Sequence, residues 1–210
     1  MPIYPDGNHS IRRCHSASML LASGMLLCSC MASGGGGSTA DVSALVQMRA
    51  DANRLLDRYD PIEYTDLSTV PTTGSATYSG FISGQLADTG DTVTDSLIGE
   101  LLVEVDFGAV EMVSGSADNF LDDQSNPLTG SITLSGGTLD REGDPTVDAT
   151  FQFTGQGELV DTHGQTLVLN TDFEGDFLAD GQTGIGGDVL GRVTVDGDEQ
   201  SFGGFFVSAQ

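Results

Sequence analysis

The fold is decided by the stretch Leu101-Leu102-Val103-Glu104-Val105-Asp106-Phe107. Every second residue from Leu101 to Phe107 is apolar, and the residues between them are Leu102, Glu104 and Asp106. Successive side chains of a β-strand point to opposite faces, so this period of two predicts a half-buried strand. Gly108 ends the run, and residues 110–116 follow as the expected hairpin partner. The chain is therefore expected to be mainly β.

Similar alternation extends in both directions from this stretch. The further predicted strands are residues 74–82, 131–138, 147–153, 167–170, 173–178, 189–195 and 202–207. About eight or nine strands at this spacing are typical of an antiparallel barrel or sandwich. Glycines inside and at the ends of the strands suit the bends of a barrel, and closure removes exposed edges. We expect a soluble antiparallel β-barrel of about eight strands over residues 73–210, with all ten Phe residues in its core.

A membrane-spanning barrel is the main competing architecture. It needs aromatic girdles and an apolar outer band. The chain has no Trp, and Tyr78 is the one Tyr in the predicted strands. Asp106, Asp148 and Asp176 are expected in mid-strand on the faces away from the core. These features favour a barrel surrounded by water.

Residues 41–60 contain the clearest helical pattern. Apolar residues recur at spacings of three and four, namely Leu45, Met48, Ala52, Leu55, Leu56 and Tyr59. Thr39 or Asp41 can cap this helix, and Pro61 ends it. The stripe favours a helix packed across the domain or a short stalk over a partner-binding helix.

Residues 1–29 are expected to be a lipoprotein signal peptide. Arg12-Arg13 precedes an apolar stretch of about ten residues, which is shorter than the roughly 20 that a spanning helix requires. Leu27-Cys28-Ser29-Cys30 resembles a bacterial lipobox, which implies lipidation of Cys30. An ordinary signal peptide cleaved near Ala32, or modification at Cys28, are the alternatives. The residue after Cys30 is Met31 and not the Asp that usually retains such lipoproteins in the inner membrane. A lipid anchor in the outer membrane is therefore expected.

Residues 30–40 contain the lipidated Cys30 and a Gly/Ser tether. Such a segment behaves as a flexible coil. Cys14 and Cys28 are removed with the signal, so the mature chain has no thiol for a disulfide or for catalysis.

The charge excludes one class of partner. The chain has 31 acidic residues and seven basic ones, all Arg, for a formal charge of −24. Nucleic-acid binding requires clustered basic residues and is therefore not expected. An acidic surface keeps a protein soluble and monomeric, and it also steers a cationic partner. Both explanations of the charge remain open.

The last three predicted strands carry a family resemblance. Phe173-Glu174-Gly175-Asp176-Phe177, then Gly186 to Gly191, then Phe202-Gly203-Gly204-Phe205-Phe206-Val207 follow one order of motifs. This order resembles the barrel of the transferrin-binding protein B family of surface lipoproteins, although here one barrel stands in place of two lobes. The resemblance implies a surface-exposed or periplasm-facing lipoprotein that binds a host or environmental iron-carrying protein or haem, with a TonB-type receptor as a further partner. An adhesion or structural lipoprotein unrelated to iron is the alternative.

Chemistry-bearing motifs are few, and no catalysis is expected. His163 is the one histidine of the mature chain and is a weak candidate haem ligand in a predicted hairpin turn. The loops Asp118–Asn126 and Asp196–Glu199 are rich in oxygen ligands of the kind that calcium prefers, but neither has EF-hand spacing. Solvated acidic loops are the favoured interpretation, so no cofactor or metal is expected.

Overall fold

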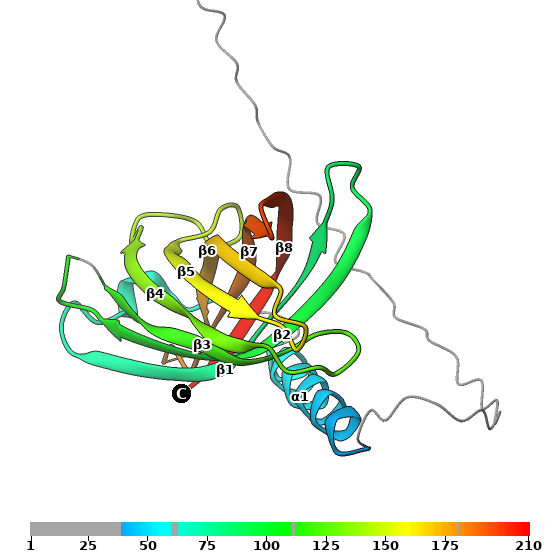
Figure 1. Ribbon diagram of the computed structural model, residues 1–210. Coiled ribbons are helices and arrows are strands. Elements are labelled where there is room, and N and C mark those ends of the chain that lie inside the picture. Colours follow the sequence, from blue (N-terminus) through cyan, green and yellow to red (C-terminus); the bar gives the residue numbers. More distant parts are fainter. Residues whose placement is uncertain (1–38, 60–62, 111, 180) are drawn as a thin grey trace, which may run out of the picture. The chain divides into compact units, whose positions relative to one another are not determined.

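A computed structural model describes residues 39–59, 63–110, 112–179 and 181–210 (Figure 1). Within these residues a helix, α1 (Thr39–Arg58), and a short 3-10 helix, η1 (Leu67–Thr69), precede eight strands. The strands are β1 (Ser75–Ala87), β2 (Val93–Asp106), β3 (Val113–Leu121), β4 (Thr129–Leu139), β5 (Phe151–Val160), β6 (Thr166–Leu178), β7 (Gly184–Val195) and β8 (Asp198–Ala209).

The strands form a closed barrel in which each pairs antiparallel with the next. β8 returns to pair with β1, from Ser79 opposite Ala209 to Ala87 opposite Ser201. No described strand is left with a free edge, which confirms the mainly β class and the closed barrel over an open sandwich. All strand pairs and all three apolar clusters lie within residues 39–210, so this part carries the whole described fold.

The barrel has two ends, because turns between antiparallel strands alternate from one end to the other. The open mouth is formed by the turns at residues 88–92, 122–128, 161–165 and 196–197. The closed end contains the connections from β2 to β3, β4 to β5 and β6 to β7, together with the segment that precedes β1.

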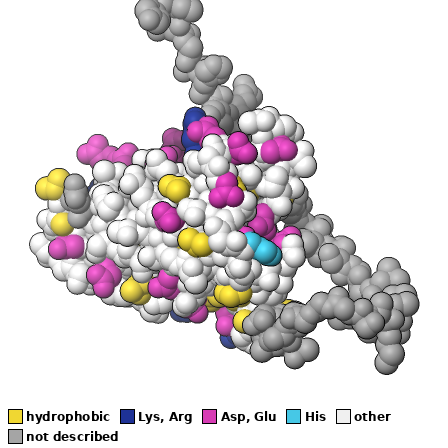
Figure 2. Space-filling model, viewed as in Figure 1, with side chains coloured by type: hydrophobic (Ala, Val, Ile, Leu, Met, Phe, Trp, Pro, Cys, Tyr) yellow, Lys and Arg dark blue, Asp and Glu magenta, His cyan; other side chains and the backbone are white. Residues whose placement is uncertain are grey.

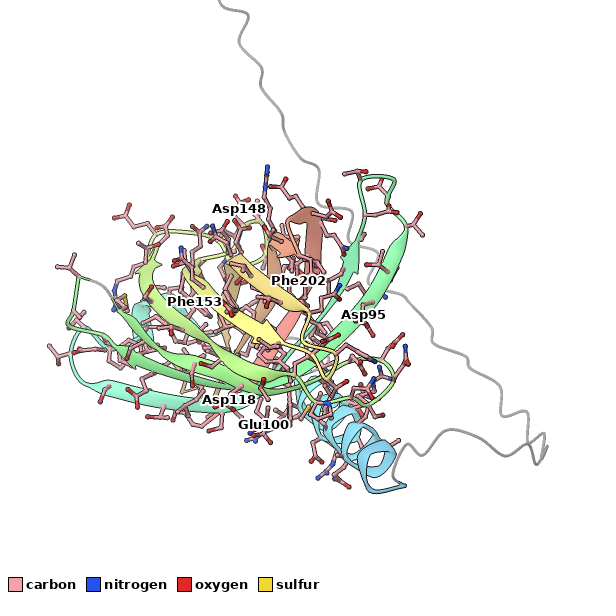
Figure 3. The ribbon with its side chains drawn as sticks, in the orientation of Figure 1. Asp95, Glu100, Asp118, Asp148, Phe153 and Phe202 are labelled. Atoms are coloured by element: carbon pink, nitrogen blue, oxygen red, sulfur yellow. The ribbon has the colours of Figure 1, made fainter. Side chains whose placement is uncertain are left out.

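Aromatic rings fill the interior (Figure 3). Eight of the ten Phe residues are buried there, namely Phe107, Phe120, Phe151, Phe153, Phe173, Phe177, Phe202 and Phe206. Phe153 and Phe173 stack with ring centroids 4.5 Å apart, and Phe206 meets both rings edge-on at 5.5 Å. The expectation for the other two was wrong, because Phe81 and Phe205 lie on the outer face and are only partly buried.

The segment before β1 seals the closed end. Leu67 and Val70 are buried against the interior cluster. Thr65 donates its N–H to the carbonyl of Phe177 at 3.0 Å and its hydroxyl to the carbonyl of Ala179 at 2.6 Å. Arg141 donates to the carbonyls of Val70 and Pro71. This guanidinium ties the β4–β5 connection to the sealing segment.

Helix α1 packs against the outside of the barrel, as its apolar stripe indicates. Leu45 and Ala52 form a cluster with Ile98 of β2 and Leu121 of β3. At the other end of the helix, Tyr59, Leu178 and Val207 form a second cluster. Leu56 is the member of the predicted stripe that remains exposed. Within the described part of the chain, no helix combines the length and hydropathy required to cross a membrane.

The strand predicted at residues 147–153 begins too early. β5 starts at Phe151, and Val147 is 58% exposed. The Asp144 carboxylate accepts hydrogen bonds from the N–H and hydroxyl of Thr146, at 2.9 and 2.6 Å, and so closes a turn. Asp148 therefore lies in a loop rather than in mid-strand, and the prediction for it was wrong.

Other boundaries also differ from prediction. Residues 167–170 and 173–178 belong to the single long strand β6, and the predicted strand at 110–116 begins later, at Val113 of β3.

Asp176 of β6 was expected on an exposed face but is only 8% exposed. Its carboxylate accepts from the N–H and hydroxyl of Thr150, at 2.9 and 2.6 Å. Asp176 thus fixes the start of β5 rather than meeting solvent.

Candidate functional site

A pocket of about 200 Å³ opens at the open mouth. Its lining comes from distant parts of the chain: Leu86, Thr94, Asp95, Asp122, Leu128, Asp161, Gln165, Leu167, Val195 and Gln200. The opposite end of the barrel is covered by the sealing segment. A second hollow of about 230 Å³ lies along β4, β5 and β6, lined by Gly137, Gln152 and Glu174 among others. The pocket of about 200 Å³ differs from it in lying at an end of the barrel.

The pocket has an aliphatic floor. Leu86, Leu128 and Leu167 are buried, and Val195 is packed against the same interior cluster. Leu86, Leu167 and Val195 lie near the ends of β1, β6 and β7, on the inward-facing positions of the strand alternation. Leu128 follows from the loop between β3 and β4 and is held there by its N–H, which donates to the carbonyl of Phe120 at 2.8 Å.

Three turns of the open mouth have the same hydrogen-bond pattern. Each begins with an aspartate, namely Asp88, Asp122 or Asp161. In each turn the Asp Oδ1 accepts from the N–H groups two and four residues later, at 2.7 to 3.0 Å. In each, the residue three positions after the Asp has a positive φ of 59° to 86°. Short Asx turns of this kind explain why aspartate recurs at the rim. Asp122 and Asp161 therefore have a structural role besides any role in the pocket.

Asp95 has no such turn role. It lies in β2, and its carboxylate accepts from the N–H of Ser96 at 2.7 Å. Burial raises the pKa of Asp95, and the negative charges of Asp123 and Asp122 raise it further against the opposing effect of the backbone hydrogen bonds. A carboxyl group disfavoured in its charged form by burial and by like charges is typical of functional sites.

Amide side chains complete the rim. Gln165 donates to Asp196 Oδ2 at 3.1 Å, across from the β5–β6 turn to the β7–β8 turn. Gln200 accepts from the Thr94 hydroxyl at 2.8 Å. These contacts cross between hairpins and link three of the four at the mouth, namely β1–β2, β5–β6 and β7–β8.

His163 lies where the sequence predicted it, in the β5–β6 turn. Its side chain is 84% exposed, and its Nδ1 is 3.5 Å from Asp161 Oδ2. It stands at the edge of the mouth but does not line the pocket. The structure thus brings the predicted His163 next to the pocket without giving it a second ligand from the described residues.

The remaining predicted sites are the lipidation site at Cys30 and the two acidic loops. Cys30 and the tether up to residue 38 lie outside the described residues. The loop Asp118–Asn126 covers the end of β3 and one Asx turn, and Asp196–Glu199 covers the β7–β8 turn. Among the described residues, no three acidic, histidine or cysteine side chains are grouped to hold a metal ion.

The chain matches no protein-family model, no curated protein and no solved structure.

Sequence reasoning did not find the pocket, because residues 86, 95, 122 and 161 meet only when the barrel closes. One signal was available. An aspartate opens each of the four turns of the open mouth, namely Asp88, Asp122, Asp161 and Asp196. In an up-and-down barrel, alternate hairpin turns share one end, so these four residues could have been assigned together to an acidic rim.

Proposed function

We propose that this chain is a lipid-anchored binding protein of the outer membrane, tethered through Cys30, which holds its partner at the open mouth and catalyses no reaction. The observation that carries the proposal is the asymmetry of the barrel. One end is covered by the segment with Leu67 and Val70, and the other presents a pocket of about 200 Å³.

The proposed anchoring in the outer membrane is supported by the lipobox-like Leu27-Cys28-Ser29-Cys30 and by the Gly/Ser tether that follows it. The outer faces of the strands are compatible with water around the barrel, since Glu104, Asp118, Thr133, Asp172 and other polar residues alternate with the buried ones. A polar outer face, an aliphatic pocket and a tether together suit a domain that displays a binding site away from the bilayer.

The chemistry of the mouth favours a protein partner over haem. Sites for drug-sized ligands usually have volumes of roughly 300–1,000 Å³, and the pocket of about 200 Å³ is smaller. Haem also carries two propionates, which would meet the carboxylates of Asp95, Asp122 and Asp161. A side chain that protrudes from a protein surface fits both the volume and the charge better.

Two experiments test the proposal. Radiolabelled palmitate should enter the wild-type protein and be lost in Cys30→Ala, whereas equal labelling of both proteins would exclude Cys30 as the anchor. In an absorbance titration, residues 31–210 should leave the spectrum of added haem the same as that of free haem. A spectral shift that disappears in His163→Ala would instead support haem binding at the mouth and exclude the protein-partner version.

A further inference from the structure

We infer that the exposed side of α1 is the face that this domain presents to an anionic lipid bilayer. The inference rests on the proposed function, because it takes Cys30 to be held in that bilayer. It adds the surface through which the anchored domain meets the membrane. This face is separate from the site at the mouth, since the pocket there is lined by the strands and turns of the barrel.

The chain between the anchor and α1 is short. Residues 31–38 lie between Cys30 and Thr39, the first residue of α1. The nine steps from residue 30 to residue 39 extend over at most about 30 Å, which is also the approximate length of a 20-residue helix such as α1. A bilayer that holds Cys30 therefore lies within about one helix length of the start of α1.

The side of α1 that the barrel leaves uncovered has an apolar and cationic stripe. Val46, Arg49, Asn53 and Leu56 are all exposed. They follow one another at spacings of three and four residues, so they lie along one side of the helix, and we call them the docking stripe. Val46 is 62% exposed and Leu56 is 37% exposed. Apolar side chains enter the headgroup region of a bilayer, and a guanidinium binds lipid phosphate, so the docking stripe suits a bilayer interface.

The docking stripe contains no carboxylate. Helix α1 as a whole has three arginines and three aspartates, so its formal charge is zero. Asp51 lies on another side of the helix, where it accepts from Gln47 at 3.0 Å and pairs with Arg54. Asp57, which follows Leu56, is the carboxylate nearest to the docking stripe along the chain. An anionic bilayer therefore meets a neutral helix whose docking stripe presents one cation.

The barrel has a very different charge. Residues 74–210 contain 24 acidic residues and two basic ones, Arg141 and Arg192. Figure 2 shows acidic side chains spread over the visible face, with few basic ones among them. An anionic bilayer repels such a surface and attracts an arginine close to it. Repulsion of the barrel and attraction of Arg49 therefore turn the same side of the domain toward the membrane.

The test uses residues 30–210, which contain the whole described fold and have Cys30 as their one thiol. Cys30 is coupled to a maleimide-headgroup lipid in bilayer discs that contain phosphatidylglycerol and a gadolinium-chelating lipid. Methyl NMR signals close to the gadolinium lose intensity. The signals of Val46 and Leu56 should therefore be lost, while the signal of Val168 on β6 should persist.

Val168 is a matched reporter for Val46. It is 47% exposed, and β6 is four strands away from β2, against which α1 packs, in the closed order of eight. Equal loss of the Val46 and Val168 signals, or a greater loss at Val168, would overturn the inference. A shift of the Val46 and Leu56 signals with protein concentration in the absence of discs would also overturn it, because the docking stripe would then bind a second copy of the chain.

Matched variants identify the groups that dock. Arg49→Gln should reduce the gadolinium effect at Leu56 about 3- to 5-fold, because one arginine near an anionic surface is lost. Arg192→Gln removes the same charge from β7 and should change the effect less than about 1.5-fold. Val46→Ser should also reduce the effect at Leu56, and Val168→Ser should leave it unchanged. Equal effects within either pair of variants would overturn the inference.

A further arm separates this inference from the proposed function. The coupling supplies the anchor chemically, so the orientation is measured whether or not cells lipidate Cys30. Equal loss at Val46 and Val168 with normal palmitate labelling of Cys30 would reject the docking stripe and leave the anchor standing. Selective loss at Val46 without palmitate labelling would reject the anchor, and the inference with it, because no bilayer would then be held within reach of α1.

Discussion

The ring of Tyr59 occupies the space that a side chain at Gly184 would need. The Tyr59 hydroxyl also donates to the carbonyl of Thr183 at 2.7 Å, so the residue after α1 is fixed on the start of β7 by both packing and a hydrogen bond. An added Cβ at Gly184 would overlap the ring. The close approach explains why glycine occupies this position, and it makes α1 a part of the domain rather than a free stalk.

We predict that Gly184→Ala displaces Tyr59 and destabilises the domain by about 1–3 kcal/mol, the usual range for overpacking. Urea unfolding measures the loss, and amide hydrogen exchange in α1 should accelerate. Gly203→Ala on the neighbouring strand β8 is the control, because an added Cβ there lies 3.9 Å from Leu190, at ordinary contact distance. Equal stability of Gly184→Ala and Gly203→Ala would show that Tyr59 does not dock the helix.

A second prediction concerns the guanidinium at the closed end. Arg141→Met removes the donors to the carbonyls of Val70 and Pro71 and should cost about 1–3 kcal/mol. Arg192→Met removes an exposed pair with Glu199 and should cost less than about 1 kcal/mol. Thermal unfolding compares the two variants, which share the same change in charge. A larger loss in Arg192→Met would contradict the sealing role of Arg141.

The alternation of apolar and polar residues predicted the strands well where one face of the strand is buried and the other is exposed. Residues 101–106 form the alternating buried and exposed end of β2, because only the barrel interior decides their burial, and Phe107 follows in the turn. Val147 misled the same reasoning, since Asp144 and Thr146 form a turn that alternation does not reveal. Hydrogen bonds of side chains to backbone compete with strand pairing over so short a distance.

The candidate site was less predictable because it depends on closure of the sheet. Asp95 looked like one acid among many, and its pKa is raised first by burial and then by the nearby charges of Asp123 and Asp122, which the sequence does not reveal. Three of the 31 acidic residues have a local explanation instead, because Asp88, Asp122 and Asp161 each open an Asx turn. Composition gave the sign of the charge correctly but could not separate turn-forming aspartates from the one in the pocket.

A third prediction tests the shared turn design. Asp161→Ala should accelerate hydrogen exchange at the amides of His163 and Gln165, which lose their acceptor. Desolvation raises the pKa of Asp161, but the hydrogen bonds from Gln165 and His163 outweigh it and lower the pKa overall. Protection in wild type should therefore persist to lower pH than for an ordinary aspartate, and should be lost as the pH falls through the lowered pKa. Unchanged exchange in Asp161→Ala would show that the backbone alone holds the turn.

The fourth prediction is that Asp95→Asn stabilises the domain at neutral pH. Burial raises the pKa of Asp95 in the folded state above the ordinary value of 3.8, and Asp123 and Asp122 add to this effect. The folded state therefore binds more protons than the unfolded state between the two pKa values, so stability falls as the pH rises through this interval. Asn removes the charge and can still accept from the N–H of Ser96.

Urea unfolding at pH 7 and pH 3 measures this effect. The gain at pH 7 should be small, within about 0.5 kcal/mol, because Asp95 is partly exposed. At pH 3 the carboxyl is protonated in both states, so the difference between Asp95→Asn and wild type should vanish. Asp148→Asn, which removes a charge from the loop before β5, should show no such pH-dependent gain. A loss of stability in Asp95→Asn at pH 7 would mean that the backbone hydrogen bonds of Asp95 outweigh its burial and the repulsion from Asp123 and Asp122.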